Sequence, residues 1–166
     1  RVFVPPLWGN KRFGSMRPNA PIVGISWYEA NAYANWLLAH WADCEESKTL
    51  SKPRFLRLPT RAEWVQAAGG AEPENRFPWD AVGQAKTTQP EEAATIAEVI
   101  RRANIEQSEI SRTTPVWLYP QGASQPYGLM DLGGNVWEWQ ANYRNEKNGW
   151  LQLSGGSWDD NWNYAR

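Results

Sequence analysis

Residue types that commonly carry catalysis or bind metal ions are scarce in this sequence. The 166 residues include one Cys, Cys44, and one His, His40. These two lie four positions apart, which would place them on one face of a helix at a spacing that suits metal ligands. A zinc site made of Cys and His needs more of both, and a single Cys excludes an intramolecular disulfide. We therefore interpret His40 as a lone histidine beside Trp41, and Cys44 as a small thiol that is buried or half-buried.

Two adjacent carboxylates, Asp159 and Asp160, are the next candidates for chemistry. Neighbouring carboxylates can differ in pKa and so divide the work of acid and base. Adjacent residues of an extended chain point to opposite faces, however, so the two side chains do not need to share a site. The sequence favours solvated polar contact residues over an acid and base pair.

The balance of charge argues against nucleic acid as a partner. Lys and Arg total 17 and Asp and Glu total 18, so no large basic surface is expected. No apolar run approaches the roughly 18 to 20 residues of a membrane span, and no signal-peptide pattern opens the chain. We expect no membrane partner, and the single Cys together with the missing export signal favours the cytoplasm without deciding the compartment.

Tryptophan is unusually abundant, with 12 Trp against 4 Phe and 6 Tyr. Hydrophobic residues make up 42% of the chain and charged residues 21%, which is typical of a globular domain and excludes a disordered chain. We expect one domain over residues 1–166.

Two capping boxes predict where helices begin. Ser26 is followed three positions later by Glu29, and Thr60 by Glu63. The first predicts an amphipathic helix over about 27–43, whose apolar face comprises Trp27, Ala30, Ala34, Leu37, Leu38 and Trp41. The second predicts a short helix from Arg61 to about Ala68 that stops at two glycines, Gly69 and Gly70. A third apolar period predicts a helix over about 93–103, and 83–90 is expected to be a loop.

The C-terminal half changes to short runs separated by Gly and Pro. Segments 114–119, 135–139 and 150–153 are predicted as strands. Helices in the first half followed by short strands indicate an α+β chain that is rich in loops.

Six segments carry motifs in a fixed order along nearly the whole chain. They are 21–30 (PIVGISWYEA) with 32–33 (AY) and 35–37 (NWL), 57–64 (RLPTRAEW) with 67–68 (AA), 77–79 (FPW), 113–116 (TTPV), 127–139 (YGLMDLGGNVWEW) and 155–158 (GGSW). In these motifs the sequence resembles the formylglycine-generating-enzyme family, also known as sulfatase-modifying factors. The resemblance implies a C-type-lectin-like α+β fold with two main helices and short antiparallel strands. It also implies a domain trimmed at both ends.

Oxidising members of this family bind copper through two Cys that follow the Gly-Gly-Ser-aromatic motif, and they convert a substrate Cys to formylglycine with oxygen. At the two corresponding positions this chain has Asp160 and Ala165. Neither residue can supply a thiolate, and copper(I) prefers sulfur to a carboxylate. The resemblance therefore implies a chain without copper and without the oxidase activity.

Family members often hold a structural calcium ion, and one such site matches the segment that begins at Asp131. By resemblance, Asp131 and Glu138 would supply side-chain oxygens. Gly134 and Val136 would supply backbone carbonyls, and hard oxygen ligands on a Gly-rich turn suit Ca²⁺. The alternative is that Asp131 and Asn135 cap the turn while Glu138 pairs with an Arg.

Another branch of the same fold comprises ligand-binding variable proteins that are diversified by retroelements. Their variable region opens with Gly-Gly-Ser-Trp and is rich in Asn codons, from which Asp and Tyr each differ by one adenine change. Adenine changes cannot convert an Asn codon to a Trp codon, so Trp162 would be a fixed residue. Rigid aromatic side chains beside adaptable polar ones suit a contact surface. The candidate ligand-binding residues are Trp158, Asp159, Asp160, Asn161, Trp162, Asn163 and Tyr164, together with Trp117, where relatives commonly have Gly.

The leading hypothesis is a non-catalytic module that binds a protein or another macromolecule, with a polar loop that only covers the core as the plain alternative for 158–164. A copper and oxygen-dependent oxidase, and a structural or sensory domain of a larger protein, are the competing functions. Six Trp within the motifs are expected to be scaffold: Trp27, Trp36, Trp64, Trp79, Trp137 and Trp139.

Overall fold

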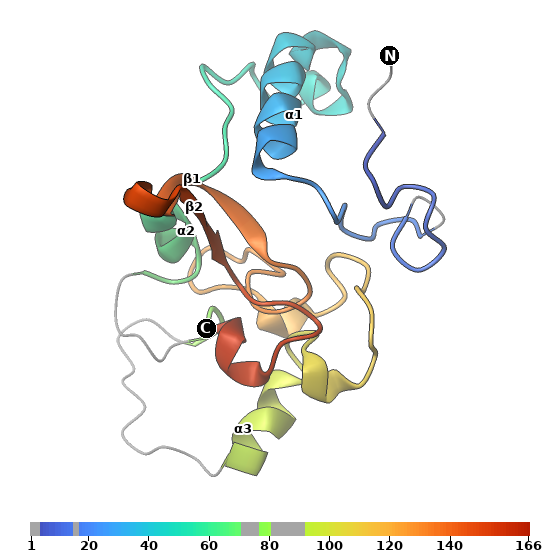
Figure 1. Ribbon diagram of the computed structural model, residues 1–166, viewed down its shortest axis with the longest axis vertical. Helices are drawn as coiled ribbons and strands as arrows, with labels where there is room; N and C mark the ends of the chain where they lie inside the picture. Colours follow the sequence, from blue (N-terminus) through green and yellow to red (C-terminus); the bar gives the residue numbers. More distant parts are fainter. Residues whose placement is uncertain (1–3, 15–16, 71–76, 81–91) are drawn as a thin grey trace.

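The computed structural model describes residues 4–14, 17–70, 77–80 and 92–166 (Figure 1). The helices and strands of this part of the chain are α1 (Trp27–Ala39), α2 (Arg61–Ala67), α3 (Glu92–Val99), β1 (Glu138–Asn145) and β2 (Trp150–Ser154). Short 3-10 turns and irregular segments connect them, so the loop-rich α+β architecture is confirmed. The predicted loop at 83–90 lies outside the described residues.

Helix α1 begins where the capping box predicts. The Ser26 Oγ accepts the N–H of Glu29 at 3.3 Å, and the Glu29 carboxylate accepts the N–H of Ser26 at 2.6 Å. The helix ends at Ala39, so the predicted end near Asp43 was wrong. At His40 the backbone leaves α-helical geometry, and the His40 carbonyl accepts the N–H of Asp43 in a tighter 3-10 turn.

The two faces of α1 differ in their exposure. The predicted apolar face is confirmed, because Ala34 is buried and its companions are half-buried: Trp27, Ala30, Leu37, Leu38 and Trp41. Trp36, expected as a scaffold residue, is 51% exposed on the opposite face. It stacks between Tyr33 and His40, with ring centroids 5.9 and 4.9 Å away. Helical spacing explains the difference, since these three rings recur on the side away from Ala34.

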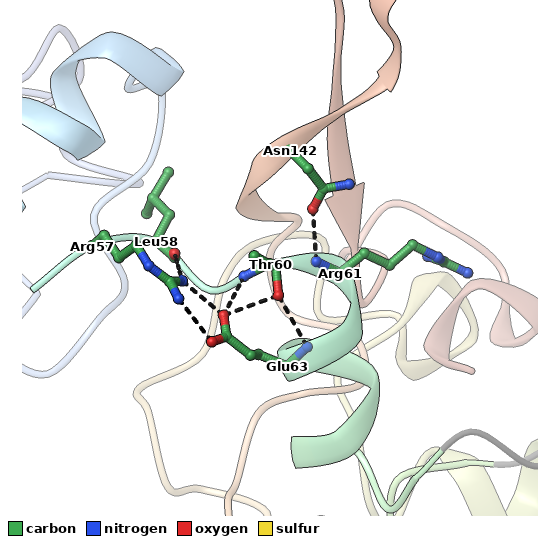
Figure 2. A network of polar contacts seen from close by, with 6 residues as sticks. All are labelled: Arg57, Leu58, Thr60, Arg61, Glu63 and Asn142. Carbon is green, nitrogen blue, oxygen red and sulfur yellow. Dashed lines mark hydrogen bonds and ion pairs between the residues drawn. The ribbon is translucent and has the colours of Figure 1, made fainter.

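Helix α2 begins in a network of polar contacts (Figure 2). The Thr60 Oγ1 accepts the N–H of Glu63 at 3.3 Å, and the Glu63 carboxylate accepts the N–H of Thr60 at 2.7 Å. The Arg57 guanidinium donates to both oxygens of Glu63, at 2.7 and 2.8 Å. The N–H of Arg61, in the first helical turn, donates to the Asn142 Oδ1 at 2.7 Å. This last bond ties the start of α2 to β1.

The end of α2 and its buried residue also agree with the sequence. The helix stops at Ala67, and Gly69 and Gly70 follow with φ angles of 111° and 97°, in the left-handed region that favours glycine. Trp64 is 5% exposed and packs inward. A short helix therefore presents one large anchor to the sheet.

Strands β1 and β2 form an antiparallel pair, with Glu138 opposite Ser154 and Trp139 opposite Leu153. The predicted strand at 150–153 is confirmed, and the one at 135–139 begins only at Glu138. The delay follows from positive φ angles at Gly134 (76°) and Asn135 (64°), which no regular strand adopts.

The predicted strand at 114–119 was wrong. The N–H of Thr114 donates to the Asn135 side chain at 2.9 Å, and the N–H of Val116 donates to the Asn19 carbonyl at 2.7 Å. Trp117 then has a φ of 67°. These backbone groups are satisfied by separate partners instead of a neighbouring strand, so the segment stays irregular.

The core connects the C-terminal segment with α3 and the segment 77–79. Its buried members are Phe77, Trp79, Val99, Ala103, Ile105 and Ala165. The phenyl ring of Phe77 stacks on Trp79 with centroids 4.9 Å apart. In the described part of the chain, no helix is long and apolar enough to span a membrane.

Candidate binding surface and cation site

The C-terminal segment is fastened to the rest of the domain by main-chain hydrogen bonds. The N–H of Gly134 donates to the Gly155 carbonyl at 2.7 Å, and the N–H of Trp158 donates to the Asn135 carbonyl at 3.1 Å. The Asp160 carbonyl accepts the N–H of Glu106 at 2.9 Å. The predicted binding segment thus follows a fixed path over the core.

Trp162 belongs to the packed side of this segment. It is half-buried against the core, with its ring centroid 6.3 Å from that of Phe77. The Arg166 guanidinium lies 4.6 Å from the centroid of the Trp162 ring, within cation–π range. The main-chain N–H of Trp162 also donates to the Gln107 Oε1, at 3.1 Å. Its side chain is therefore an anchor more than a free contact group.

Trp158 is also covered on one side. Its ring stacks on Phe13 with centroids 6.0 Å apart, and the Arg12 guanidinium lies 5.2 Å from the Trp158 centroid. The residue is half-buried. It joins the N-terminal segment to the C-terminal one.

Asp160 is a structural acceptor. Its Oδ2 accepts hydrogen bonds from the Trp137 indole N–H at 2.8 Å and from the Ser157 hydroxyl. Asn161 likewise turns back on the chain, since its Oδ1 accepts the N–H of Asn163 at 3.0 Å. The two adjacent carboxylates are separated as expected for neighbouring residues, because Asp159 is exposed while Asp160 is half-buried.

The residues that remain open to a partner are Asp159, Asn163 and Tyr164. Tyr164 is 50% exposed and meets the Trp137 ring edge to face, at 5.8 Å and 70°. Trp137 itself is 37% exposed, although the sequence had assigned it to the scaffold. Nothing in the local sequence of Trp137 signals this, because its partners lie more than twenty residues further along the chain. We call these four residues the contact face.

Trp117 lies apart from the contact face. Its side chain is 72% exposed, and its left-handed backbone costs a residue other than glycine about 1–2 kcal/mol. The Trp117 N–H donates to the Asp131 Oδ2 at 2.8 Å. Among the described residues, no hydrogen bond, ion pair or ring contact joins Trp117 to the segment 158–164. The structure therefore does not bring all the predicted ligand-binding residues into contact.

An open groove of about 560 Å³ adjoins the contact face. Its lining includes Trp137 of the contact face, with Ser157 and Trp158 of the GGSW motif. The other lining residues are mostly apolar: Ile22, Val23, Gly24, Ile25, Ala30, Leu58, Pro59, Asn135, Val136, Glu138, Trp139 and Leu153. None of the lining residues is basic.

The predicted cation ligands Asp131 and Glu138 lie close enough to influence each other. Burial raises the pKa of the Glu138 carboxyl, and the charge of Asp131 raises it further. Instead of an Arg, the indole N–H of Trp64 donates to the Glu138 Oε2 at 2.6 Å. Over the described ranges, no hydrogen bond or ion pair reaches the second oxygen of either carboxylate.

A backbone carbonyl predicted as a cation ligand also has a lone pair to offer. The Gly134 carbonyl accepts the N–H of Val136 at 2.8 Å and retains a second lone pair. No group of three or more His, Cys, Asp and Glu residues that could hold a metal exists in the described part of the chain. Two carboxylates with backbone carbonyls and water remain a hard-oxygen set of the kind that Ca²⁺ accepts, so the residues present fit this ion.

The structure places no thiol beside the GGSW motif within the described residues. Ala165 is 1% exposed in the core, and Asp160 accepts the hydrogen bonds described above. Cys44 lies in the turn after α1, where its thiol donates to the His40 carbonyl at 3.4 Å.

Comparison with known proteins then decides the family. A profile of the sulfatase-modifying factor enzyme 1-like domain matches residues 7–166. The chain belongs to this family. The family resemblance and the fold expected from the six motifs are thereby confirmed.

Individual relatives within the family differ in their chemistry. The formylglycine-generating enzyme of Thermomonospora curvata is 33% identical over 128 residues, covering 76% of this chain and 35% of the relative. The inactive C-alpha-formylglycine-generating enzyme 2 of Bos taurus is 30% identical over 141 residues, covering 84% and 39% respectively. The chain thus spans about two fifths or less of the length of these relatives. Active enzymes and a protein named as inactive both occur among them.

Solved structures share the fold. Treponema denticola variable protein 1 aligns with a TM-score of 0.59 at 23% identity, over 89% of this chain and 63% of that protein. The crystal structure of CarF aligns with a TM-score of 0.54 at 25% identity, over 89% and 60%. The fold of this chain therefore also occurs in a variable protein.

Proposed function

We propose that this chain is a non-catalytic module that binds a protein or another macromolecule. One observation carries the proposal: the C-terminal segment divides into anchored residues and open ones. Trp162 and Asp160 hold the segment in place, while Asp159, Asn163 and Tyr164 are exposed and the Tyr164 ring meets that of Trp137. This is the arrangement of a contact surface on a rigid support.

The chemistry of the contact face suits recognition of a large partner. Tyr164 and Trp137 offer aromatic area with few rotatable bonds, and Asp159 and Asn163 offer adaptable hydrogen bonding. The adjoining groove of about 560 Å³ extends this face with apolar area. Trp117, 72% exposed, would act as a second and separate contact.

The absence of catalysis rests on the residues at the family's two cysteine positions. Asp160 and Ala165 cannot form the thiolates that bind copper. Asp160 also has another function, because its carboxylate holds the Trp137 indole and the Ser157 hydroxyl. The inactive relative of Bos taurus supports the view that the domain can persist without the activity.

Calcium belongs to the same proposal as a stabiliser of the scaffold. Asp131 and Glu138 would hold the ion with their free oxygens, together with the carbonyls of Gly134 and Val136. Its function there is to neutralise two neighbouring carboxylates and to stiffen the turn that supports the C-terminal segment.

Diversification by a retroelement would explain why the open positions carry Asp, Asn and Tyr. The likeness to the Treponema variable protein supports only the fold, so the genetic origin needs its own test. The neighbouring DNA supplies it: a reverse transcriptase gene and a template repeat matching the coding region of 155–166 are expected. Absence of both would contradict diversification by a retroelement but would not affect the proposed contact face.

The binding function is tested by comparing the partners captured by three forms of the chain. The first is the wild type, and the second replaces Asp159, Asn163 and Tyr164 with Ala. The matched control replaces Tyr28 and Tyr33 with Ala, which are 71% and 61% exposed on α1. A partner retained by the wild type and the control, and lost by the triple variant, is expected. Equal retention by all three would overturn the proposal.

Catalysis is tested separately with the copper-loaded chain and a Cys-containing peptide in an oxygen electrode. We expect no oxygen consumption above that of free copper. Sustained turnover with formation of formylglycine would favour the oxidase instead.

A further inference from the structure

We propose that a divalent cation at Asp131 and Glu138 fixes the backbone of Trp117 and so links the cation site to the ligand surface. The inference rests on the proposed function, because it assigns Trp117 to that surface. It goes further by giving the cation a second function, which is to control the presentation of one contact residue.

The geometry begins at the Asp131 carboxylate. One oxygen, Oδ2, accepts the N–H of Trp117 at 2.8 Å. Within the described residues the other oxygen accepts no hydrogen bond, so it remains free to bind a cation. A single carboxylate can therefore bind the ion and the Trp117 backbone at the same time.

Trp117 depends on this hydrogen bond more than an ordinary loop residue would. Its φ of 67° is rarely adopted by a residue that carries a Cβ, and its side chain is 72% exposed, so packing contributes little to holding it. The neighbouring bond from the Val116 N–H to the Asn19 carbonyl fixes the chain on one side, at 2.7 Å. Asp131 fixes it on the other.

The charge of Asp131 also affects a second residue of this loop. Burial raises the pKa of the Tyr119 hydroxyl, and the Asp131 charge raises it further. Asp131 itself has a φ of 62°, so its own backbone is held in an uncommon conformation. A cation that immobilises this carboxylate removes the freedom through which the loop would open.

Thermodynamic linkage makes the effect reciprocal. If the cation binds only when Asp131 accepts the Trp117 N–H, it shifts the loop toward the conformation with this hydrogen bond formed. The cation then raises the affinity for a ligand that contacts Trp117 in this conformation. By linkage, that ligand raises the affinity for the cation by the same factor.

The experiment measures hydrogen exchange of the Trp117 amide in the whole chain, with Ca²⁺ and with a chelator, in the absence of any ligand. At a Ca²⁺ concentration of 100 times Kd, protection should rise by up to about 100-fold if the open loop cannot hold the ion. Calorimetry on the same samples reports whether Ca²⁺ binds. Calcium binding that changes the exchange rate of the Trp117 amide by no more than about twofold would overturn the link. The absence of calcium binding would overturn it as well.

Two substitutions separate the cation from the hydrogen bond. Glu138→Gln keeps an acceptor for Trp64, weakens the cation site and leaves the Asp131 acceptor untouched. It should retain the calcium-free protection of Trp117 and lose the calcium-dependent rise. Asp131→Ala should lose both. Circular dichroism and the melting temperature establish that each variant is folded, and an unfolded Asp131→Ala leaves the Glu138→Gln result to decide.

A further comparison separates failure of the calcium link from failure of the proposed function. A calcium-dependent rise in protection, with no ligand lost on replacing Trp117 by Ala, would keep the link and remove Trp117 from the ligand surface. Loss of ligand binding in that variant, with no effect of calcium on Trp117 exchange, would keep Trp117 in the ligand surface and remove the link.

Discussion

The Asp160 carboxylate accepts the indole N–H of Trp137 at 2.8 Å, and this bond joins two segments that are distant in the sequence. It fixes the orientation of the Trp137 ring, on whose surface Tyr164 rests edge to face. The position at which oxidising relatives have a cysteine is therefore occupied here by a residue that organises the contact face.

Asp160→Ala is expected to destabilise the fold, whereas Asp159→Ala is not. Loss of a carboxylate that accepts two side-chain hydrogen bonds should lower the free energy of unfolding by about 1–2 kcal/mol. Asp159 is exposed, so its removal should stay within about 0.5 kcal/mol. Urea unfolding of both variants measures the difference, and equal effects would show that Asp160 has no structural function.

The division between anchor and contact predicts opposite consequences for two aromatic residues. Trp162→Ala should cost about 2–3 kcal/mol, because a half-buried ring leaves the core. Tyr164→Ala should cost about 1 kcal/mol or less, since the ring is 50% exposed and loses one aromatic pair. Under conditions where both variants are folded, Tyr164→Ala should weaken ligand binding more than Trp162→Ala does. A Trp162 variant as stable as wild type would contradict the assignment.

Glu63 is expected to make the stability of the chain depend on acid pH. Hydrogen bonds from Arg57, with those from Thr60, hold the pKa of Glu63 at about 2, below its ordinary value of 4.5. Because the folded-state pKa is the lower one, the ionised group stabilises the fold above about pH 4.5. This contribution disappears as the pH falls toward about 2. The side chain is on the surface, so the effect should be modest.

The matched variant for this effect is Glu63→Gln, which retains an acceptor for the capping box but does not titrate. Melting temperatures at several pH values between 2 and 4.5 should fall faster in the wild type than in the variant. Parallel profiles would mean that the Arg57 pair contributes nothing in solution.

Calcium is expected to raise the melting temperature relative to a chelator, by the equivalent of about 2.7 kcal/mol at 100 times Kd. Terbium offers a local probe, because Trp64 donates to Glu138 and would sensitise the luminescence of an ion bound there. Trp64→Phe should reduce that luminescence, while Trp36→Phe, on the exposed face of α1, should not. No luminescence in any form would argue against the site.

Much of the scaffold was predictable because its signals are local. Each capping box lies within four residues, and the buried side of α1 follows from helical spacing, so Ser26, Thr60 and Ala34 could all be placed in advance. The end of α1 could not be predicted as well, because His40 carries no sequence signal for a change to 3-10 geometry.

The candidate site was only partly predictable because its determinants are distant contacts. Trp117 and Trp137 look alike in the sequence, yet one is held by Asp131 and the other by Asp160. Trp162 lies among the exposed residues of the segment and nevertheless packs on the core. No local pattern encodes such pairings, because they arise when separate segments meet in space.

The main-chain bonds that fasten the C-terminal segment have a consequence for its evolution. The donors and acceptors at Gly134, Gly155, Trp158 and Asp160 are backbone groups, so these bonds persist whichever side chains the outward positions carry. Asp159, Asn163 and Tyr164 can therefore be replaced at little cost to folding. A lineage could explore many specificities at these positions while the support beneath them stays the same.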